Sequence, residues 1–181
     1  MVDYSAPKIL PWTSWAEWLD TYKQLYSDSV ESMRKGLTRL HYWNSRGRAP
    51  WSLSATEILV SLKLTVMYRY PNNVTRSDQA YNARFIEQEM TDRLAISAAI
   101  INIVNGYVDQ HQKGRFAISI NNIAKKIKLP EFLVDLRHTA THQEIPSLKI
   151  LIHAFYMLDD WVRENYWLKQ LAHLESIPKK I

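Results

Sequence analysis

The chain contains no cysteine and only 4 glycines among its 181 residues. The absence of cysteine excludes disulfides, Cys-ligated zinc, iron–sulfur clusters and thiol catalysis. So few glycines argue against a β-sandwich, a β-barrel and a glycine-rich phosphate loop, because these structures use glycine where the backbone turns tightly. A mainly helical fold fits both absences.

Long hydrophobic runs are also missing. No stretch reaches the length of about 20 apolar residues that a membrane-spanning helix needs. Asp3, Lys8 and Pro11 interrupt any apolar run near the start, so no signal-peptide pattern is present. We therefore expect an intracellular, soluble protein without a membrane partner.

The composition is that of a globular domain, with 46% apolar and 23% charged residues. The length is enough for one domain with a sizeable core, and we take residues 1–181 as that domain. The net charge of +5 favours an acidic partner such as nucleic acid, but many basic domains bind no polyanion.

Helical periodicity runs through nearly every segment. Ser14 with Glu17 and Ser54 with Glu57 have the spacing of capping boxes, which predicts helix starts at both places. A third helix should end at Tyr70-Pro71. The longest helix is expected over residues 78–108, with a kink or an end at Asn105-Gly106.

The later helices lead into the most informative segment. Ser119 to Ile127 predicts a short helix, and Pro130 can open the next one. That helix should carry Phe132, Leu133 and Leu136 inward. Ile145-Pro146 should separate it from the last helix.

The segment Arg137-His138-Thr139-Ala140-Thr141-His142 is an Arg-x-x-x-x-His arrangement suited to metal-free RNA cleavage. Arg137 can bind a phosphate and stabilise transition-state charge. His142 can act as general acid or base. His138 shares its helix face and can orient the substrate or carry the second proton. The candidates to fix a histidine tautomer are Asp135, Thr141 and Glu144.

Other interpretations of these residues exist. Arg137 can instead pair with Asp135 or Glu144 at a solvated helix end, and spacing alone favours that ordinary role. A zinc site on His138 and His142 would lack the glutamate that follows the first histidine in zinc proteases, and its third ligand would have to be Glu144, His153 or another residue. The lysines at 125, 126 and 128 can contact RNA or form a solvated helix face.

The wider pattern resembles a known family. Residues 129–148 read Leu-Pro-Glu-Phe-Leu-Val-Asp-Leu-Arg-His-Thr-Ala-Thr-His-Gln-Glu-Ile-Pro-Ser-Leu and resemble the signature block of the Las-one family. Further family-like blocks extend the resemblance over almost the whole chain: Pro11-Trp12, Glu17-Trp18, Trp43, Arg46-Gly47, Pro50, Val104-Asn105-Gly106, Val108-Asp109, Gln112, Trp161 and Tyr166-Trp167. The chain departs from the family at Asn102-Ile103, where an Arg-Phe pair is expected.

The resemblance implies an all-α HEPN-type bundle of about six to seven helices that forms a homodimer. It implies a metal-independent endoribonuclease of the nucleus and nucleolus, with Arg137, His138 and His142 as the catalytic residues and no cofactor or metal. The implied reaction cuts precursor ribosomal RNA in the second internal transcribed spacer, during large-subunit ribosome biogenesis. It leaves 2′,3′-cyclic phosphate and 5′-hydroxyl ends. The implied partner is a polynucleotide 5′-kinase, and a C-terminal tail is expected beyond this domain.

Two competing functions remain open. The domain can be a dimeric RNA-binding scaffold for the kinase, with little activity of its own. It can also be a metal-dependent hydrolase that uses His138 and His142. Two measurements distinguish the endoribonuclease, the scaffold and the metal-dependent hydrolase. One is whether replacing His142 abolishes RNA cutting, and the other is whether a chelator stops that cutting.

Overall fold

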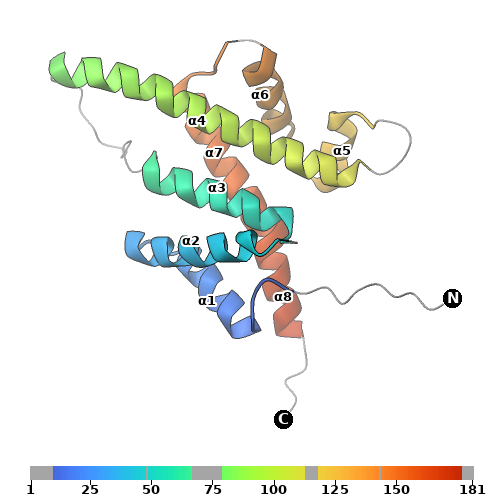
Figure 1. The fold of residues 1–181 in the computed structure, drawn as a ribbon. Helices are drawn as coiled ribbons and strands as arrows, with labels where there is room; N and C mark the ends of the chain where they lie inside the picture. Colours follow the sequence, from blue (N-terminus) through green and yellow to red (C-terminus); the bar gives the residue numbers. More distant parts are fainter. Residues whose placement is uncertain (1–9, 48, 67–78, 113–117, 143, 177–181) are drawn as a thin grey trace. The chain divides into compact units, whose positions relative to one another are not determined.

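A computed structural model describes residues 10–47, 49–66, 79–112, 118–142 and 144–176 (Figure 1). Within these ranges all regular structure is helical, and no strand occurs. The prediction of an all-α fold is therefore confirmed. The expected helix end at Tyr70-Pro71 lies outside the described residues.

The chain divides into two compact units, Met1–Val60 and Ser61–Ile181. The boundary falls inside helix α3 (Trp51–Thr65). Each unit is described by itself below. A single nuclease domain over residues 1–181 stays a prediction.

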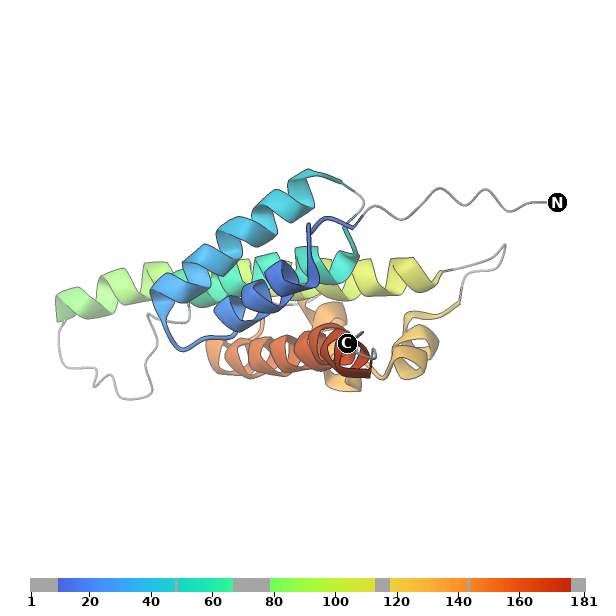
Figure 2. The ribbon, with the colours of Figure 1, turned by 90° about the horizontal axis from the view of Figure 1, so that it is seen from below.

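In the first unit, α1 (Trp15–Leu25) and α2 (Val30–Ser45) form a helical hairpin (Figure 2). The predicted cap of α1 is confirmed, because the Ser14 hydroxyl accepts a hydrogen bond from the Glu17 N–H at 3.1 Å. The Glu17 carboxylate accepts from the Thr13 N–H and from Trp43 Nε1. It therefore joins the start of α1 to the end of α2.

The capping box predicted at Ser54 and Glu57 is wrong. Helix α3 begins at Trp51, three residues earlier, directly after Pro50. The Glu57 carboxylate instead accepts hydrogen bonds from the His41 and Asn44 side chains of α2. The spacing matched a cap, but a tertiary contact uses the carboxylate.

The second unit is built around α4 (Gln79–His111), which packs against α5 (Ile120–Ile127), α6 (Glu131–His142) and α7 (Leu148–Val162) (Figure 1). Its core comes from the apolar stripes of these helices. The fully buried members include Ile96, Ile100, Ile103, Val104, Leu133, Leu151, Ala154, Phe155 and Leu158.

Two details of the predictions for this unit are wrong. Helix α4 does not end at Asn105-Gly106 but continues to His111. The alternative, a kink at Asn105-Gly106, stays a prediction. Phe132 is 38% exposed, whereas Leu133, Val134 and Leu136 are buried. Residue 132 falls outside the stripe that α6 turns toward α4 and α7.

A π-helical turn, η2 (Arg163–Leu168), joins α7 to α8 (Lys169–Ser176) without a break. Counting α7, η2 and α8 as one, the described residues hold seven continuous helices, as the sequence predicts. None of the described helices is long and apolar enough to cross a membrane.

Candidate functional site

The Arg–His segment forms the second half of α6, and His142 is its last residue. Because α6 is helical here, His138 and His142 lie one turn apart, and their ring centroids are 4.9 Å apart. Both side chains are exposed, whereas Arg137 is half-buried. The two imidazoles can therefore reach one bound molecule together.

Arg137 is held in place by helix α4. Its Nε donates a hydrogen bond to Asn105 Oδ1 at 2.9 Å. Its Nη groups have no carboxylate partner within the described part of the chain. The alternative that pairs Arg137 with Asp135 or Glu144 is therefore wrong, since a neutral amide holds the guanidinium and neither of these carboxylates is bonded to it.

The backbone that follows α6 is also tied to α4. Arg93 Nε donates to the Pro146 carbonyl oxygen at 2.8 Å, and Arg93 Nη2 donates to that of Ile145. Asn105 and Arg93 thus hold the chain on both sides of His142. Neither residue could be assigned to the site from the sequence, because nothing within four positions of either one signals a contact 32 to 53 residues away.

The predicted tautomer-fixing residues have other roles or no contact with the histidines. The Thr141 hydroxyl donates to the Arg137 carbonyl oxygen at 2.7 Å, inside the helix itself. Neither Asp135 nor Glu144 bonds to His138 or His142 in the hydrogen bonds found among the described residues. Both imidazoles are thus free to contact a substrate.

No third ligand for a metal bound by His138 and His142 lies within the part of the chain that the structure describes. No cluster of three or more His, Asp or Glu side chains able to hold a metal occurs among the described residues. The His153 ring lies 5.8 Å from that of Phe132. These positions do not support the zinc interpretation of His138 and His142.

The remaining histidines occupy separate places. His41 Nδ1 lies 2.8 Å from Glu57 Oε1 in the first unit, a partner that the sequence analysis missed. His111 Nδ1 lies 2.8 Å from the Tyr107 carbonyl oxygen, one turn earlier on α4. Neither belongs to the Arg137 cluster.

Fold and site together define a class: an all-helical protein that presents an amide-anchored arginine and two adjacent imidazoles on one helix. The chain belongs to the Las1-like family, whose model matches residues 10–169.

Three relatives are similar to this chain. The pre-rRNA-processing protein las1 of Schizosaccharomyces pombe is 28% identical over 166 residues, which cover 88% of this chain and 31% of the relative. Protein LAS1 of Saccharomyces cerevisiae is 41% identical over 76 residues, 41% of this chain and 15% of the relative. The mouse ribosomal biogenesis protein LAS1L is 25% identical over 165 residues, 90% of this chain and 19% of the relative. The chain therefore spans less than a third of each relative.

Proposed function

We propose that this chain is the HEPN-type nuclease domain of an endoribonuclease that processes precursor ribosomal RNA in the nucleus and nucleolus. The names of two relatives, a pre-rRNA-processing protein and a ribosomal biogenesis protein, support the process. One observation carries the chemistry: two imidazoles with centroids 4.9 Å apart lie next to Arg137. The Arg137 guanidinium is held by its hydrogen bond to Asn105 Oδ1.

In the proposed reaction, one imidazole removes the proton from a ribose 2′-hydroxyl. The 2′-oxygen forms a bond to the adjacent phosphorus, and the bond from phosphorus to the 5′-oxygen breaks. The other imidazole donates a proton to that oxygen. The Arg137 Nη groups bind the phosphate oxygens, whose charge increases in the transition state. The products carry 2′,3′-cyclic phosphate and 5′-hydroxyl ends, and no step requires a metal.

A second copy of the chain completes the proposed site. The attacking and leaving oxygens lie roughly in line across the phosphorus, so acid and base must approach it from opposite sides. His138 and His142 project from one face of one helix and reach the phosphate from the same side. A homodimer in which two α6 segments face each other supplies the other side.

The proposed substrate is the second internal transcribed spacer, cut during large-subunit ribosome biogenesis. The 5′-hydroxyl end that cutting leaves is a substrate for a polynucleotide 5′-kinase, and we propose such a kinase as partner. The second candidate function, an RNA-binding scaffold for the kinase, is an outcome of the same test.

The test is cleavage of an end-labelled spacer RNA with the kinase partner present and a chelator in excess. Wild type, His142→Ala and His173→Ala are compared, and the 3′ ends of the products are typed. His173 is a matched control because it is an exposed histidine on α8, outside the Arg137 cluster. We expect cutting by wild type and His173→Ala only, with cyclic-phosphate ends.

Equal cutting by wild type and His142→Ala would remove His142 from the reaction. RNA binding without any cutting would favour the scaffold. Cutting that the chelator stops and zinc restores would favour the metal-dependent hydrolase.

A further inference from the structure

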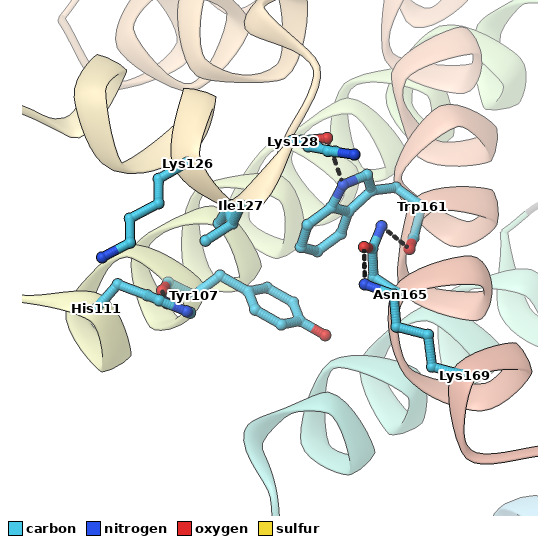
Figure 3. Close-up of a pocket in the computed structure, with 8 residues that line it drawn as sticks. All are labelled: Tyr107, His111, Lys126, Ile127, Lys128, Trp161, Asn165 and Lys169. Carbon is cyan, nitrogen blue, oxygen red and sulfur yellow. Dashed lines mark hydrogen bonds between the residues drawn. The ribbon is translucent and has the colours of Figure 1, made fainter. Parts of the chain in front are cut away.

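A pocket of about 380 Å³ lies in the second unit, lined by residues of α4, α5, α7, η2 and α8 together with Lys128 (Figure 3). Its lining contains three lysines, Lys126, Lys128 and Lys169, and no acidic residue. The ion pairs found within the described residues all use other side chains. Uncompensated positive charge around a concavity attracts anions.

The pocket is separate from the Arg137 cluster. Tyr107 lines the pocket and Asn105 anchors Arg137, and the two are two positions apart on α4. Two positions turn a helix by about 200°, so these side chains point to different sides of α4. They are only about 3 Å apart along the axis, so a polymer that contacts both places has to pass around α4.

Lys128 carries the most informative backbone feature of the pocket. Its φ of 57° makes it the one non-glycine residue with positive φ among the described residues. The Lys128 and Leu129 N–H groups donate to the Lys125 and Ala124 carbonyl oxygens, which closes α5 with a Schellman motif. Glycine fits this position best because a Cβ is strained there. A lysine at this position is less favourable for folding than glycine, and strained backbone positions of this kind cluster at functional sites.

Hydrogen bonds also connect the lining residues on α7, η2 and α8. Trp161 Nε1 donates to the Lys128 carbonyl oxygen at 2.7 Å, and Asn165 Nδ2 donates to the Trp161 carbonyl oxygen at 3.0 Å. Lys169 Nζ donates to Asn165 Oδ1 at 2.8 Å. Asn165 belongs to the π turn η2, a type of turn often found at functional sites. Lys169 is therefore joined to Trp161 through Asn165.

The floor of the pocket is aromatic. The Tyr107 and Trp161 rings meet edge to face, with centroids 4.8 Å apart. Lys126 and Lys169 lie on opposite sides of this pair (Figure 3). The volume lies within the range of about 300 to 1,000 Å³ typical of small-molecule sites. Cations around an apolar floor fit a phosphate joined to a planar base.

We infer that this pocket binds a nucleotide of single-stranded RNA, with Lys126, Lys128 and Lys169 contacting its phosphates. The inference rests on the proposed function for the identity of the polymer. The pocket holds the substrate outside the place where cutting occurs, so it contributes to RNA affinity and not to the chemical step.

The test measures binding of a labelled single-stranded oligouridylate by fluorescence anisotropy at several salt concentrations. All proteins carry His142→Ala, so that the RNA stays intact. The pocket variant has Lys126, Lys128 and Lys169 replaced by Gln. The control has Lys23, Lys35 and Lys149 replaced by Gln, which removes the same charge from exposed lysines outside the pocket lining.

We expect the pocket variant to bind about tenfold more weakly or worse, and the control to bind nearly as wild type. Each phosphate contact on a single strand adds about 0.7 to the slope of log affinity against log salt, so three lost contacts lower that slope by about 2. Equal affinities and slopes for the two triple variants would overturn the inference.

Lys128→Gly separates binding from folding. Glycine relieves the positive-φ strain, so we expect an unchanged or higher Tm together with weaker RNA binding. A Lys128→Gly protein that is stable and binds RNA as wild type would contradict a contact by Lys128.

Uridine monophosphate distinguishes RNA from a free nucleotide. We expect it to bind far more weakly than the oligonucleotide. Equally tight binding that the pocket variant loses would identify a free nucleotide as the occupant and overturn the RNA assignment. None of these measurements needs cleavage. The inference about RNA binding in the pocket can therefore be refuted while wild type still cuts RNA, and the proposed cleavage can be refuted while the pocket still binds RNA.

Discussion

Arg137 of α6 and Asn105 of α4, 32 residues apart in the chain, are joined by a hydrogen bond of 2.9 Å between Nε and Oδ1. The bond uses one of the five N–H donors of the guanidinium. It fixes the plane of the group and leaves the Nη pair for phosphate oxygens. Asn105 is thereby a positioning residue for the proposed reaction.

Replacing Asn105 with Ala should lower kcat for RNA cleavage by about tenfold to a hundredfold, because a hydrogen bond to a charged group contributes about 1.5 to 3 kcal/mol. KM should change less, since the charge of Arg137 remains. Single-turnover cleavage at saturating RNA gives the comparison. Asn121→Ala, an exposed asparagine on α5, is the control. A rate for Asn105→Ala equal to that of the control would show that the anchor has no part in catalysis.

Arg93 should act on the same site through the backbone. Its two bonds to the carbonyl oxygens of Ile145 and Pro146 hold the segment after His142 against α4. Arg93→Ala leaves both half-buried carbonyls without this donor, and we expect a loss of roughly 1 to 3 kcal/mol in the free energy of unfolding. Urea denaturation measures the loss.

Arg93→Lys provides the matched comparison for Arg93→Ala. A lysine keeps the charge but lacks the planar fork that serves two carbonyls at once. It should recover only part of the stability and of the cleavage rate. Full recovery of both would mean that charge alone matters at this position.

Helix α1 packs tightly against α2 at Gly36. A Cβ built there would lie 3.0 Å from Gln24 Cβ and 3.0 Å from the Leu25 backbone nitrogen. Gly36→Ala should therefore lower the free energy of unfolding by about 1 to 3 kcal/mol, although alanine favours an isolated helix. Arg34→Ala, at an exposed position of the same helix, should change it little. A stabilised Gly36→Ala protein would show that the two helices separate without cost.

Asp159 should make stability depend on pH. Burial raises the pKa of its carboxyl above the ordinary value of 3.8, and the Lys63 ammonium, 3.8 Å away, opposes this shift only in part. Above pH 3.8 the unfolded chain loses this proton while the folded chain retains it. Stability from this group is thus present below pH 3.8 and lost as pH rises through the folded-state pKa.

Asp159→Asn removes this ionisation, so it should raise Tm at pH 7 and change it much less at acid pH. Thermal denaturation of both proteins across this range tests the expectation. Asp109→Asn is the control, since its carboxylate is exposed on α4 and is not among the charges that shift the pKa of Asp159. An Asp159→Asn protein that is less stable at pH 7 would mean that the pair with Lys63 outweighs the burial of the carboxylate.

Local patterns were enough to predict much of the fold. Ser14 caps its helix where the sequence places the cap, α5 covers nearly the residues predicted for it, and the break at Ile145-Pro146 is confirmed. The closeness of His138 and His142 also follows from sequence, because a helix brings residues four apart together. Ser54 with Glu57 shows the limit, since the same spacing occurs inside a helix whose Glu57 carboxylate bonds to α2.

By itself, the amino-acid sequence determined the helical class, most helix bounds and the pairing of two histidines, because these depend on interactions within about four residues. Only the tertiary structure decided that Arg137 bonds to an amide rather than a carboxylate, that Arg93 holds the segment after His142, and that Lys126, Lys128 and Lys169 surround one pocket. The two hydrogen bonds join residues 32 or more positions apart, and the pocket brings Lys169 of α8 together with lysines in and directly after α5. Their partners depend on how α4, α5, α6 and α7 pack, and no local pattern encodes that packing.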